Sequence, residues 1–271
     1  MNTAATSHRQ FFDKVLGECE AGHTRDAVLM LSGMLDVSLG QPDAVTALRR
    51  QFAAHPLNQL ISSAPGPTGH QTQTTLTGRS RCLHDAVSRL GFSRGLAARA
   101  ELGARAVELA WQRGEQIALL DCGEQGELER LRGNAIDNIA MAHKERATED
   151  WLRSQFGLAA PGPKPRFDLI LATGWADHCD TDELAIRLGT AMRWLAPKGS
   201  LLLSAFVPGH LGAGWQTICL RRDLVCHAEG DLARAAAIAG FGLTQFRDSS
   251  GSLIWAELKI AVPNGTKRGA A

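Results

Sequence analysis

The sequence predicts an α/β fold with a parallel sheet, and three neighbouring segments support this prediction. Residues Phe167 to Thr173 form a short apolar run closed by Gly174, which is typical of a strand buried on both faces. Residues Asp182 to Leu195 carry apolar side chains at close to helical spacing, and Leu201 to Phe206 is a second apolar run. A strand, a helix and a strand joined by tight turns must cross over, so we expect two parallel neighbours in one sheet.

The helix between these strands has recognisable signals at both ends. Asp180, Thr181 and Asp182 are candidate N-caps, because short polar side chains accept hydrogen bonds from the first turn. Pro197 and Gly199 are expected to stop the helix before the second strand begins at Leu201.

Composition sets limits on the class of protein. The chain has 271 residues, of which 44% are hydrophobic, enough for one large domain with a helical annex. A formal net charge of +1 offers no electrostatic case for binding nucleic acid or an anionic membrane. We expect no membrane span and no signal peptide, because the chain has no long apolar run. The six cysteines show no paired framework, which is typical of reduced thiols in a cytoplasmic protein.

The first 80 residues are expected to form a helical annex and a flexible linker. Apolar residues recur at helical spacing from His8 to Leu39, and Gly22 to Thr24 separate two helices. Pro42 opens a third helix, which His55-Pro56 ends. Ser62 to Ser80 combines proline, glycine, threonine and glutamine, a composition that predicts a loop.

The second domain is expected over residues 81–262. It starts with a helix from Leu83 to Trp111, which leads into the apolar strand Gln116 to Leu120. An alanine-rich helix from Asp231 to Ala239, with Asp231 as its N-cap, precedes the end of the domain.

The C-terminal part of that domain predicts a hairpin. Leu243 to Phe246 and Leu253 to Leu258 alternate on either side of a turn at Asp248 to Gly251. Residues 263–271 are expected to be a disordered tail.

Part of the chain resembles a known family. The stretch Phe167-Asp168-Leu169-Ile170 and the later stretch Leu195-Ala196-Pro197-Lys198-Gly199 are similar to class I S-adenosylmethionine-dependent methyltransferases. They match the fourth strand of that fold and the turn before its fifth strand, although Lys198 stands where the turn has its first glycine. The resemblance implies a Rossmann-like methyltransferase sheet with a C-terminal antiparallel hairpin, and S-adenosylmethionine as cofactor.

More narrowly, the chain resembles the branch that makes 3-hydroxypalmitic acid methyl ester signals. The matching pieces are His55-Pro56-Leu57, Ala172 to Asp177, and Phe246 to Leu258. This resemblance implies O-methylation of a hydroxy fatty acid or a similar acid. The branch has a motif similar to K-P-R-G-Y-A-G-D after the His-Pro-Leu piece, expected to help form the active site. This sequence has no counterpart to it and contains no tyrosine.

The expected cofactor turn follows the strand that ends at Leu120. Asp121, Cys122, Gly123 and Gly126 are the candidates, because the backbone there must pass close to the cofactor. Only Gly123 falls on the usual three-glycine pattern, and Gly126 is out of step. An ordinary strand-to-helix turn is therefore the alternative.

An acidic residue at the end of the second strand is expected to hold the ribose hydroxyls, about 20 residues further on. Asp137 is the candidate, although it comes early. The interval from Gly123 to Phe167 is short for a helix, a strand, a helix and a strand. Either one unit is missing, or Ala135 to Ile139 lies within a long helix and Asp137 is a surface residue.

The loop after the strand that ends at Thr173 supplies further candidates. Gly174 and Trp175 are expected at the cofactor, because ligands bind at the carboxyl edge of open α/β sheets. Trp175 is expected either to stack on the adenine or to cover the methyl donor. Asp177, His178 and His210 are the catalytic candidates, and either histidine can serve as general base. A loop surface with a helix cap is the alternative for these polar residues.

Other kinds of chemistry find less support. The His178-Cys179 and Cys226-His227 pairs lack the spacing of a metal site, and no metal is expected. The sequence has neither a G-x-S-x-G motif nor a phosphate-binding P-loop, which argues against a typical α/β hydrolase or P-loop NTPase.

Two functional hypotheses therefore follow. One is a methyltransferase with a small-molecule substrate, for which we expect no nucleic-acid or membrane partner and consider a homodimer or a protein partner possible. The other is a degenerate protein of the same fold that no longer methylates and acts as a partner, regulator or ligand binder. The incomplete glycine pattern and the missing motif support the second hypothesis.

Overall fold

The computed structural model describes residues 3–58, 82, 85–120, 139–142, 166–219 and 223–261. The expected linker at Ser62 to Ser80, the cofactor turn at residues 121–126, Asp137 and the C-terminal tail lie outside the described residues. So does the expected domain boundary near residue 80.

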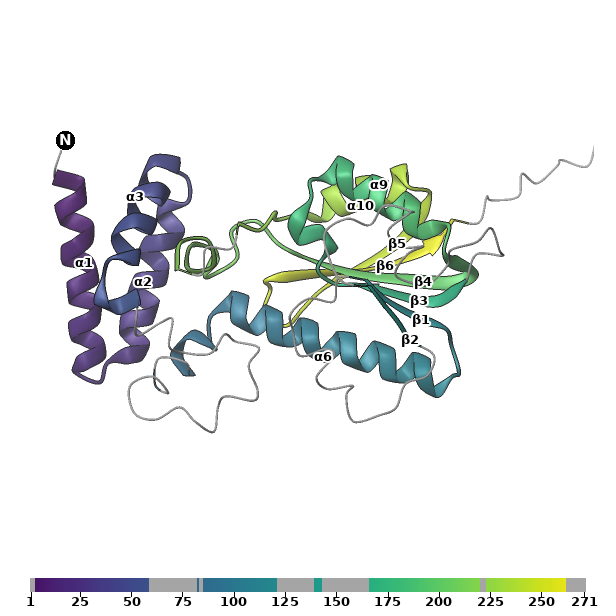
Figure 1. Cartoon of the computed structure of the whole chain (residues 1–271), viewed down its shortest axis with the longest axis horizontal. Helices are drawn as coiled ribbons and strands as arrows, with labels where there is room; N and C mark the ends of the chain where they lie inside the picture. Colours follow the sequence, from purple (N-terminus) through teal and green to yellow (C-terminus); the bar gives the residue numbers. More distant parts are fainter. Residues whose placement is uncertain are drawn as a thin grey trace, which may run out of the picture.

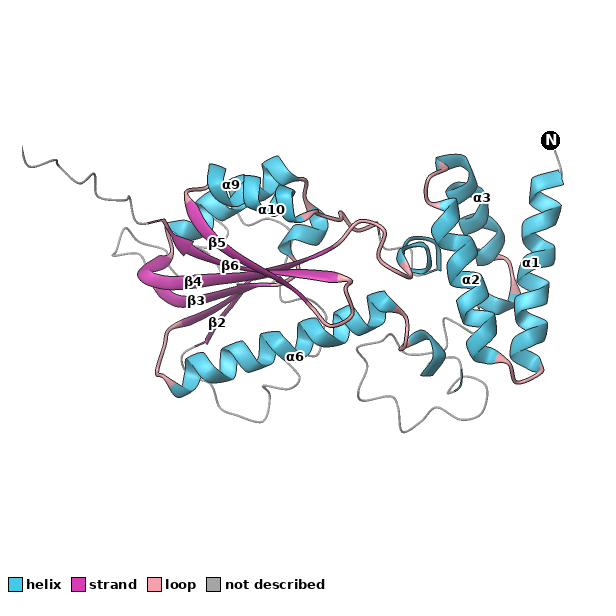
Figure 2. Ribbon diagram, turned by 180° about the vertical axis from the view of Figure 1, so that it is seen from behind, coloured by secondary structure: helices cyan, strands magenta, loops and turns pink. Residues whose placement is uncertain are grey.

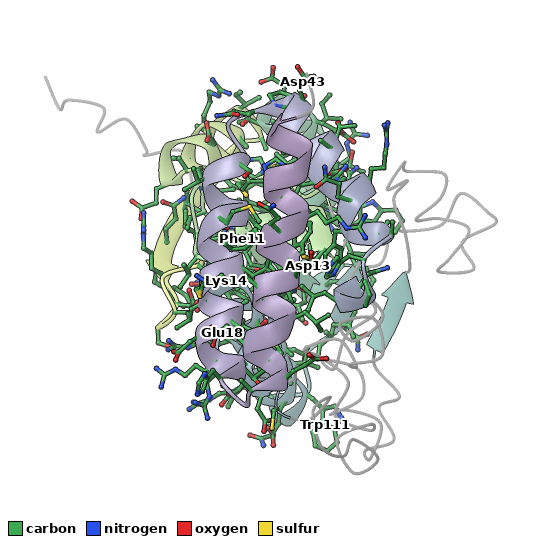
Figure 3. All side chains as sticks on the ribbon, turned by 90° about the vertical axis from the view of Figure 1, so that its left-hand side faces the viewer. Phe11, Asp13, Lys14, Glu18, Asp43 and Trp111 are labelled. Atoms are coloured by element: carbon green, nitrogen blue, oxygen red, sulfur yellow. The ribbon has the colours of Figure 1, made fainter. Side chains whose placement is uncertain are left out.

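The N-terminal annex contains the expected helices. They are α1 (Thr3–Glu20), α2 (Thr24–Ser38) and α3 (Pro42–Ala53), and Pro42 lies in the first turn of α3, as predicted. Figure 3 faces this annex, with Asp13, Lys14 and Glu18 following one another along α1. Phe12 and Phe52 pack edge to face between α1 and α3, with ring centroids 5.7 Å apart.

The rest of the described chain is built on a six-stranded sheet with the order β2-β1-β3-β4-β6-β5. Strands β2, β1, β3 and β4 are parallel to one another, and β6 is antiparallel to both β4 and β5. The strands are β1 (Ile117–Leu120), β2 (Ile139–Ala142), β3 (Phe167–Ala172), β4 (Leu195–Phe206), β5 (Phe241–Arg247) and β6 (Leu253–Ile260). The fold class is thus confirmed as a Rossmann-like sheet that ends in an antiparallel hairpin.

Helices cover both faces of this sheet (Figures 1 and 2). Helix α6 (Gly91–Gln112) crosses one face, where Val107 and Ala110 share a buried cluster with Leu119, Leu171 and Trp255. Helices α9 (Thr181–Met192) and α10 (Glu229–Ile238) pack side by side on the other face. That face carries the largest part of the apolar core, because alternate side chains of β4 and β6 point toward it.

The connection from α9 to β4 differs from the expected one. Helix α9 ends at Met192, and Leu195 is already the first residue of β4, opposite Phe167. The register with β3 shifts before Leu169 pairs with Ser200, so the Pro197-Lys198-Gly199 turn lies inside the strand as an irregularity. A Cβ on Gly199 would lie 2.7 Å from the Phe167 carbonyl oxygen, which explains why glycine is needed there.

The helix caps are partly as predicted. Of the candidates before α9, Asp180 is the cap, and its carboxylate accepts hydrogen bonds from the N–H groups of Asp182 and Glu183. Asp231 is not the N-cap of α10, because the helix begins earlier, at Glu229. Its carboxylate instead accepts a hydrogen bond from the N–H of Ala228, the residue before the helix. Asp231 thus stabilises the start of α10 from the third helical position.

Two helix boundaries also differ from the predicted ones. The helix predicted from Leu83 to Trp111 is interrupted: residues 85–87 are helical, a turn follows at residues 88–90, and α6 begins at Gly91. Ile139 begins strand β2, so the alternative of a long helix through Ala135 to Ile139 is wrong at Ile139. Asp137 precedes β2 in the chain, and its own placement lies outside the described residues. A strand of four residues is too short to give a clear pattern in the sequence.

The annex and the sheet share a second apolar cluster. It combines annex residues with the ends of α6, β4 and β6, represented by Leu35, Phe92, Phe206, Trp215 and Leu253. The contact between the two parts is close. The Asp36 carboxylate of α2 accepts hydrogen bonds from the N–H groups of Gly212 and Gly214, and a Cβ on Gly214 would lie 2.3 Å from the Leu35 carbonyl carbon.

Within the described parts of the chain, none of the helices has the length and apolar character needed to cross a membrane.

Candidate functional site

The sheet order identifies the edge at which a ligand is expected. Strand β1 has β2 on one side and β3 on the other, so the chain leaves β1 in one direction and later returns on the opposite side. Ligands of open α/β sheets bind outside the carboxyl ends of the strands at such a switch point. Leu119 pairs with Leu171, so β1 and β3 end at the same level and their following segments emerge together.

A buried ion pair lies behind this edge. The Arg99 guanidinium of α6 forms a bidentate pair with the Asp177 carboxylate, with distances of 2.5 Å from Nη1 to Oδ2 and 3.1 Å from Nη2 to Oδ1. The side chains are only 5% and 4% exposed. Asp177 belongs to the 3-10 helix η1 (Trp175–His178), which follows β3 directly. The pair therefore connects α6 to the segment that leaves β3 at the switch point.

Arg99 also contacts an aromatic ring, that of Phe206. Its guanidinium carbon lies 5.0 Å from the centroid of the Phe206 ring at the end of β4. The His210 ring stacks on the same Phe206 ring, with a centroid distance of 4.8 Å. His210 is 5% exposed, so it lies in the interior and not on the loop surface.

Both ring nitrogens of His210 have an oxygen within hydrogen-bonding distance. Nδ1 lies 2.9 Å from the Val207 carbonyl oxygen, and Nε2 lies 3.2 Å from Oε1 of Gln216. Gln216 belongs to the π-helix η2 (Trp215–Cys219), which packs against α2 and α3 of the annex. His210 thus joins the carboxyl edge of the sheet to the annex.

A second buried histidine stabilises η1. His227 donates from Nε2 to the carbonyl oxygens of Ala176, at 2.8 Å, and Cys179, at 3.1 Å. The same segment contributes two main-chain bonds, from Val225 N–H to the Asp177 carbonyl and from His227 N–H to the Phe206 carbonyl. Asp177 is therefore fixed through its backbone as well as its carboxylate.

The predicted residues of the β3 loop differ in accessibility. Trp175 is 2% exposed and packs in the main apolar cluster, so its ring offers no free face for stacking on an adenine in this conformation. Gly174 is half-buried and His178 is exposed. Asp177 and His210 belong to one chain of contacts, in which Asp177 pairs with Arg99 and His210 stacks on Phe206, the ring beneath Arg99. His178, in contrast, is exposed. Asp121, Cys122, Gly123, Gly126 and Asp137 are not among the described residues.

Arg99, Gln216 and the role of His227 could not be predicted from the sequence. Arg99 was hidden in an amphipathic helix, where an arginine normally indicates the solvated face, and it lies 78 residues from Asp177. An arginine amid the small residues Gly95, Ala100 and Gly103 was the available signal, because that neighbourhood predicts close packing on several sides.

Cysteine chemistry finds no support at this edge. Burial raises the pKa of the Cys179 thiol to about 12, and Arg187 lowers it only in part. The Cys179 Sγ donates to the Trp175 carbonyl oxygen at 3.1 Å. Among the described residues, no group of three or more histidine, cysteine, aspartate or glutamate side chains is placed to hold a metal ion.

Comparison with known proteins gives similarity only at the level of the fold. No family model and no curated protein matches this chain. A solved structure of a possible exported protein from Bordetella parapertussis is similar over 94% of this chain and 99% of its own, with a TM-score of 0.50 and 16% identity. Since that match covers nearly the whole of both chains, it supports the arrangement of an annex and a sheet as one fold.

Two solved methyltransferases have lower structural similarity to this chain than that protein. The mitomycin 7-O-methyltransferase MmcR has a TM-score of 0.42 and 18% identity, over 83% of this chain and 74% of its own. A TehB-like SAM-dependent methyltransferase from Corynebacterium glutamicum has a TM-score of 0.38 and 17% identity, over 62% of this chain and 94% of its own.

Proposed function

We propose that this protein is an S-adenosylmethionine-dependent methyltransferase acting on a small molecule. The observation that carries the proposal is the sheet: parallel strands in the order β2-β1-β3-β4, extended by a hairpin whose last strand, β6, lies between β4 and β5. Its switch point falls between Leu120 and Ala172, beside the sequence positions of the expected cofactor turn.

The described residues fit such a cofactor in position. Strands β1 and β3 end side by side, and Gly174 supplies a half-buried backbone position directly after β3. Trp175 contributes packing in this conformation, so any adenine contact requires other residues. When bound, the cofactor would supply an electrophilic methyl group attached to a sulfonium. The chain would have to orient an acceptor oxygen in line with that methyl group and exclude water.

For the substrate, we propose O-methylation of a hydroxy fatty acid or a similar acid. His55-Pro56-Leu57 supports this proposal through the resemblance of the sequence. In the structure His55 lies in a bend after α3, and Pro56 and Leu57 begin a further helical segment. His55 Nδ1 accepts from the Leu57 N–H, and Nε2 donates to Asp13. A carboxylate acceptor needs little help from a base, whereas a hydroxyl acceptor needs one, and His210 is the buried candidate nearest the edge.

The alternative is a protein of the same fold that binds a ligand or a partner without transferring a methyl group. Two observations favour it. The Asp177 carboxylate is engaged by Arg99, and the Trp175 ring is buried in the main apolar cluster, so neither side chain is free to contact a ligand in this conformation. A homodimer or a protein partner, and residence in the cytoplasm, remain part of the proposal on the sequence alone.

Product formation separates these functions. The full chain is incubated with S-adenosylmethionine and 3-hydroxy fatty acids of several chain lengths, and methyl esters and the demethylated cofactor are measured by mass spectrometry. Equimolar formation of both products supports the enzyme. Cofactor binding without either product from any acid supports the alternative.

A further inference from the structure

His210 is unusual among the buried histidines because each of its ring nitrogens faces an oxygen. The Val207 carbonyl oxygen can only accept, so the nitrogen 2.9 Å from it, Nδ1, must carry a proton. If Nε2 also donated to Oε1 of Gln216, at 3.2 Å, the ring would carry both protons and a positive charge.

A charged ring is unfavourable at this position. His210 is 5% exposed, and Phe206 separates it from the Arg99 guanidinium, which is already a cation. Two carboxylates that bond to residues close to His210 in the fold are engaged elsewhere, Asp177 with Arg99 and Asp36 with the N–H groups of Gly212 and Gly214. Among the described residues, the hydrogen bonds of the ring go to Val207 and Gln216 and none goes to a carboxylate. Burial without a counter-charge therefore favours the neutral imidazole.

Gln216 provides the hydrogen bond that a neutral ring needs. Its Nε2 is buried and has no hydrogen-bond partner within the described parts of the chain, while its Oε1 faces a ring nitrogen. The two ends of a glutamine amide have nearly the same shape, and the hydrogen-bond network decides which end lies where. With the ends exchanged, the amide N–H donates to His210 Nε2, and the previously unpartnered donor is satisfied.

We propose that Gln216 is a positioning residue that holds His210 as the neutral Nδ1–H tautomer and caps the Nε2 lone pair. That lone pair is the group with which His210 would accept a proton from a hydroxyl substrate. Its role in catalysis rests on the proposed methyl transfer, whereas the tautomer and the cap do not. In this conformation the base is withheld, and it becomes available when the Gln216 amide turns away.

The annex holds the cap in place. Arg49 of α3 donates from Nε and Nη2 to the Thr217 carbonyl oxygen, at 3.1 and 2.9 Å, and also pairs with Asp223. These contacts fix the π-helix that carries Gln216, and π-helical turns often occur at functional sites. A shift of α3 relative to the sheet would therefore move Gln216 with respect to His210.

The tautomer can be read directly from the histidine ring nitrogens of the full chain by long-range proton–nitrogen NMR correlations at pH 7. His55 and His227 are internal references, because their hydrogen bonds require the Nε2–H form. His210 is expected to show the opposite form, with a proton on Nδ1 only. A proton on Nε2, alone or together with one on Nδ1, would overturn the proposal.

Two substitutions test the cap itself. Q216E places a carboxylate at Nε2, and His210 is expected to carry protons on both nitrogens at pH 7. Q216L leaves the Nε2 lone pair uncapped, and modification of His210 by diethyl pyrocarbonate should accelerate about tenfold, the factor expected for one lost hydrogen bond. The matched variant Q245L, on β5, should leave His210 unchanged, since Gln245 bonds to Glu229.

The outcomes separate the two proposals. Unchanged reactivity of His210 in Q216L, in a variant that retains the wild-type circular dichroism spectrum, would contradict the cap. A confirmed tautomer in a protein that forms no methylated product would contradict the proposed function and leave the cap intact.

Discussion

Arg99 and Asp177 form a bidentate ion pair in the protein interior, and both side chains are at most 5% exposed. This pair fixes η1, the first segment after β3, against α6. Removing one partner of a buried ion pair leaves an uncompensated charge, which typically costs about 3–5 kcal/mol. We therefore expect D177A to lower the free energy of unfolding by about that amount, as measured by urea denaturation.

The double variant R99M/D177L is the control for that prediction. Because both charges are removed and apolar side chains fill the space, no uncompensated charge remains, and the variant should recover most of the stability lost in D177A. If D177A and the double variant lose the same amount, the ion pair is not what the single substitution disrupts.

The contact of the annex with the sheet depends on Gly214. A Cβ at this position would lie 2.3 to 2.5 Å from backbone atoms of Leu35 and Asp36, which cannot move independently of α2. G214A should reduce the free energy of unfolding by about 1–3 kcal/mol, the usual cost of overpacking. Gly33 lies in α2 with Leu35 and Asp36, and a Cβ there would have nothing within 4 Å. G33A should therefore stabilise the protein by up to about 1 kcal/mol. Equal effects of the two substitutions would contradict the close approach.

The start of α9 depends on the Asp180 carboxylate, which accepts from the N–H groups of Asp182 and Glu183 at 3.0 and 2.9 Å. D180A should cost about 1 kcal/mol of stability, whereas D180N should cost much less because its side-chain oxygen can still cap. The measurement is the midpoint of chemical unfolding. A loss in D180N as large as that in D180A would indicate that Asp180 acts through its charge.

The buried thiol of Cys179 makes stability depend on alkaline pH. Burial raises the pKa of Cys179 from 9.0 to about 12, so between these values the unfolded chain has lost a proton that the folded protein keeps. The unfolded state then binds fewer protons than the folded state, so the free energy of unfolding decreases as the pH rises. The stabilisation from Cys179 is thus fully present below pH 9 and is lost as the pH rises toward 12.

Unfolding midpoints at pH 7 and pH 10 test this dependence. C179A should show a smaller loss of stability between the two pH values than the wild type. C82A, which removes an exposed thiol, should behave like the wild type. An identical decline in wild type and C179A would refute the assignment.

Much of the fold could be predicted from local patterns. The β3–α9–β4 unit has long apolar runs and strong cap signals, and the C-terminal hairpin alternates around a clear turn, so the type and order of these elements were predicted correctly. The start of β4 was not, because the strand begins at Leu195, before the Pro197-Lys198-Gly199 turn that was expected to precede it. Strand β2 has only four residues, Ile139–Ala142, and lies in an interval without a periodic pattern. The sequence could not distinguish it from part of a helix, and Asp137, the candidate for the end of the second strand, lies outside the described residues.

The site was less predictable because it depends on long-range contacts. Asp177 and His210 were identified by their positions after strands, which the topology supports. Arg99 and Gln216, which engage them, lie in α6 and η2, and nothing local in the sequence indicates their partners. The burial of Trp175 likewise depends on packing from α9, which sequence position alone does not show.

The most direct test of the central claim is titration calorimetry of the full chain with S-adenosylmethionine and with its demethylated product. We expect micromolar binding of both, abolished in G123R and retained in the control G230R, whose added side chain meets open space on α10. The absence of binding by the wild-type protein, or equal binding by G123R, would contradict a cofactor site at the carboxyl ends of β1 and β3.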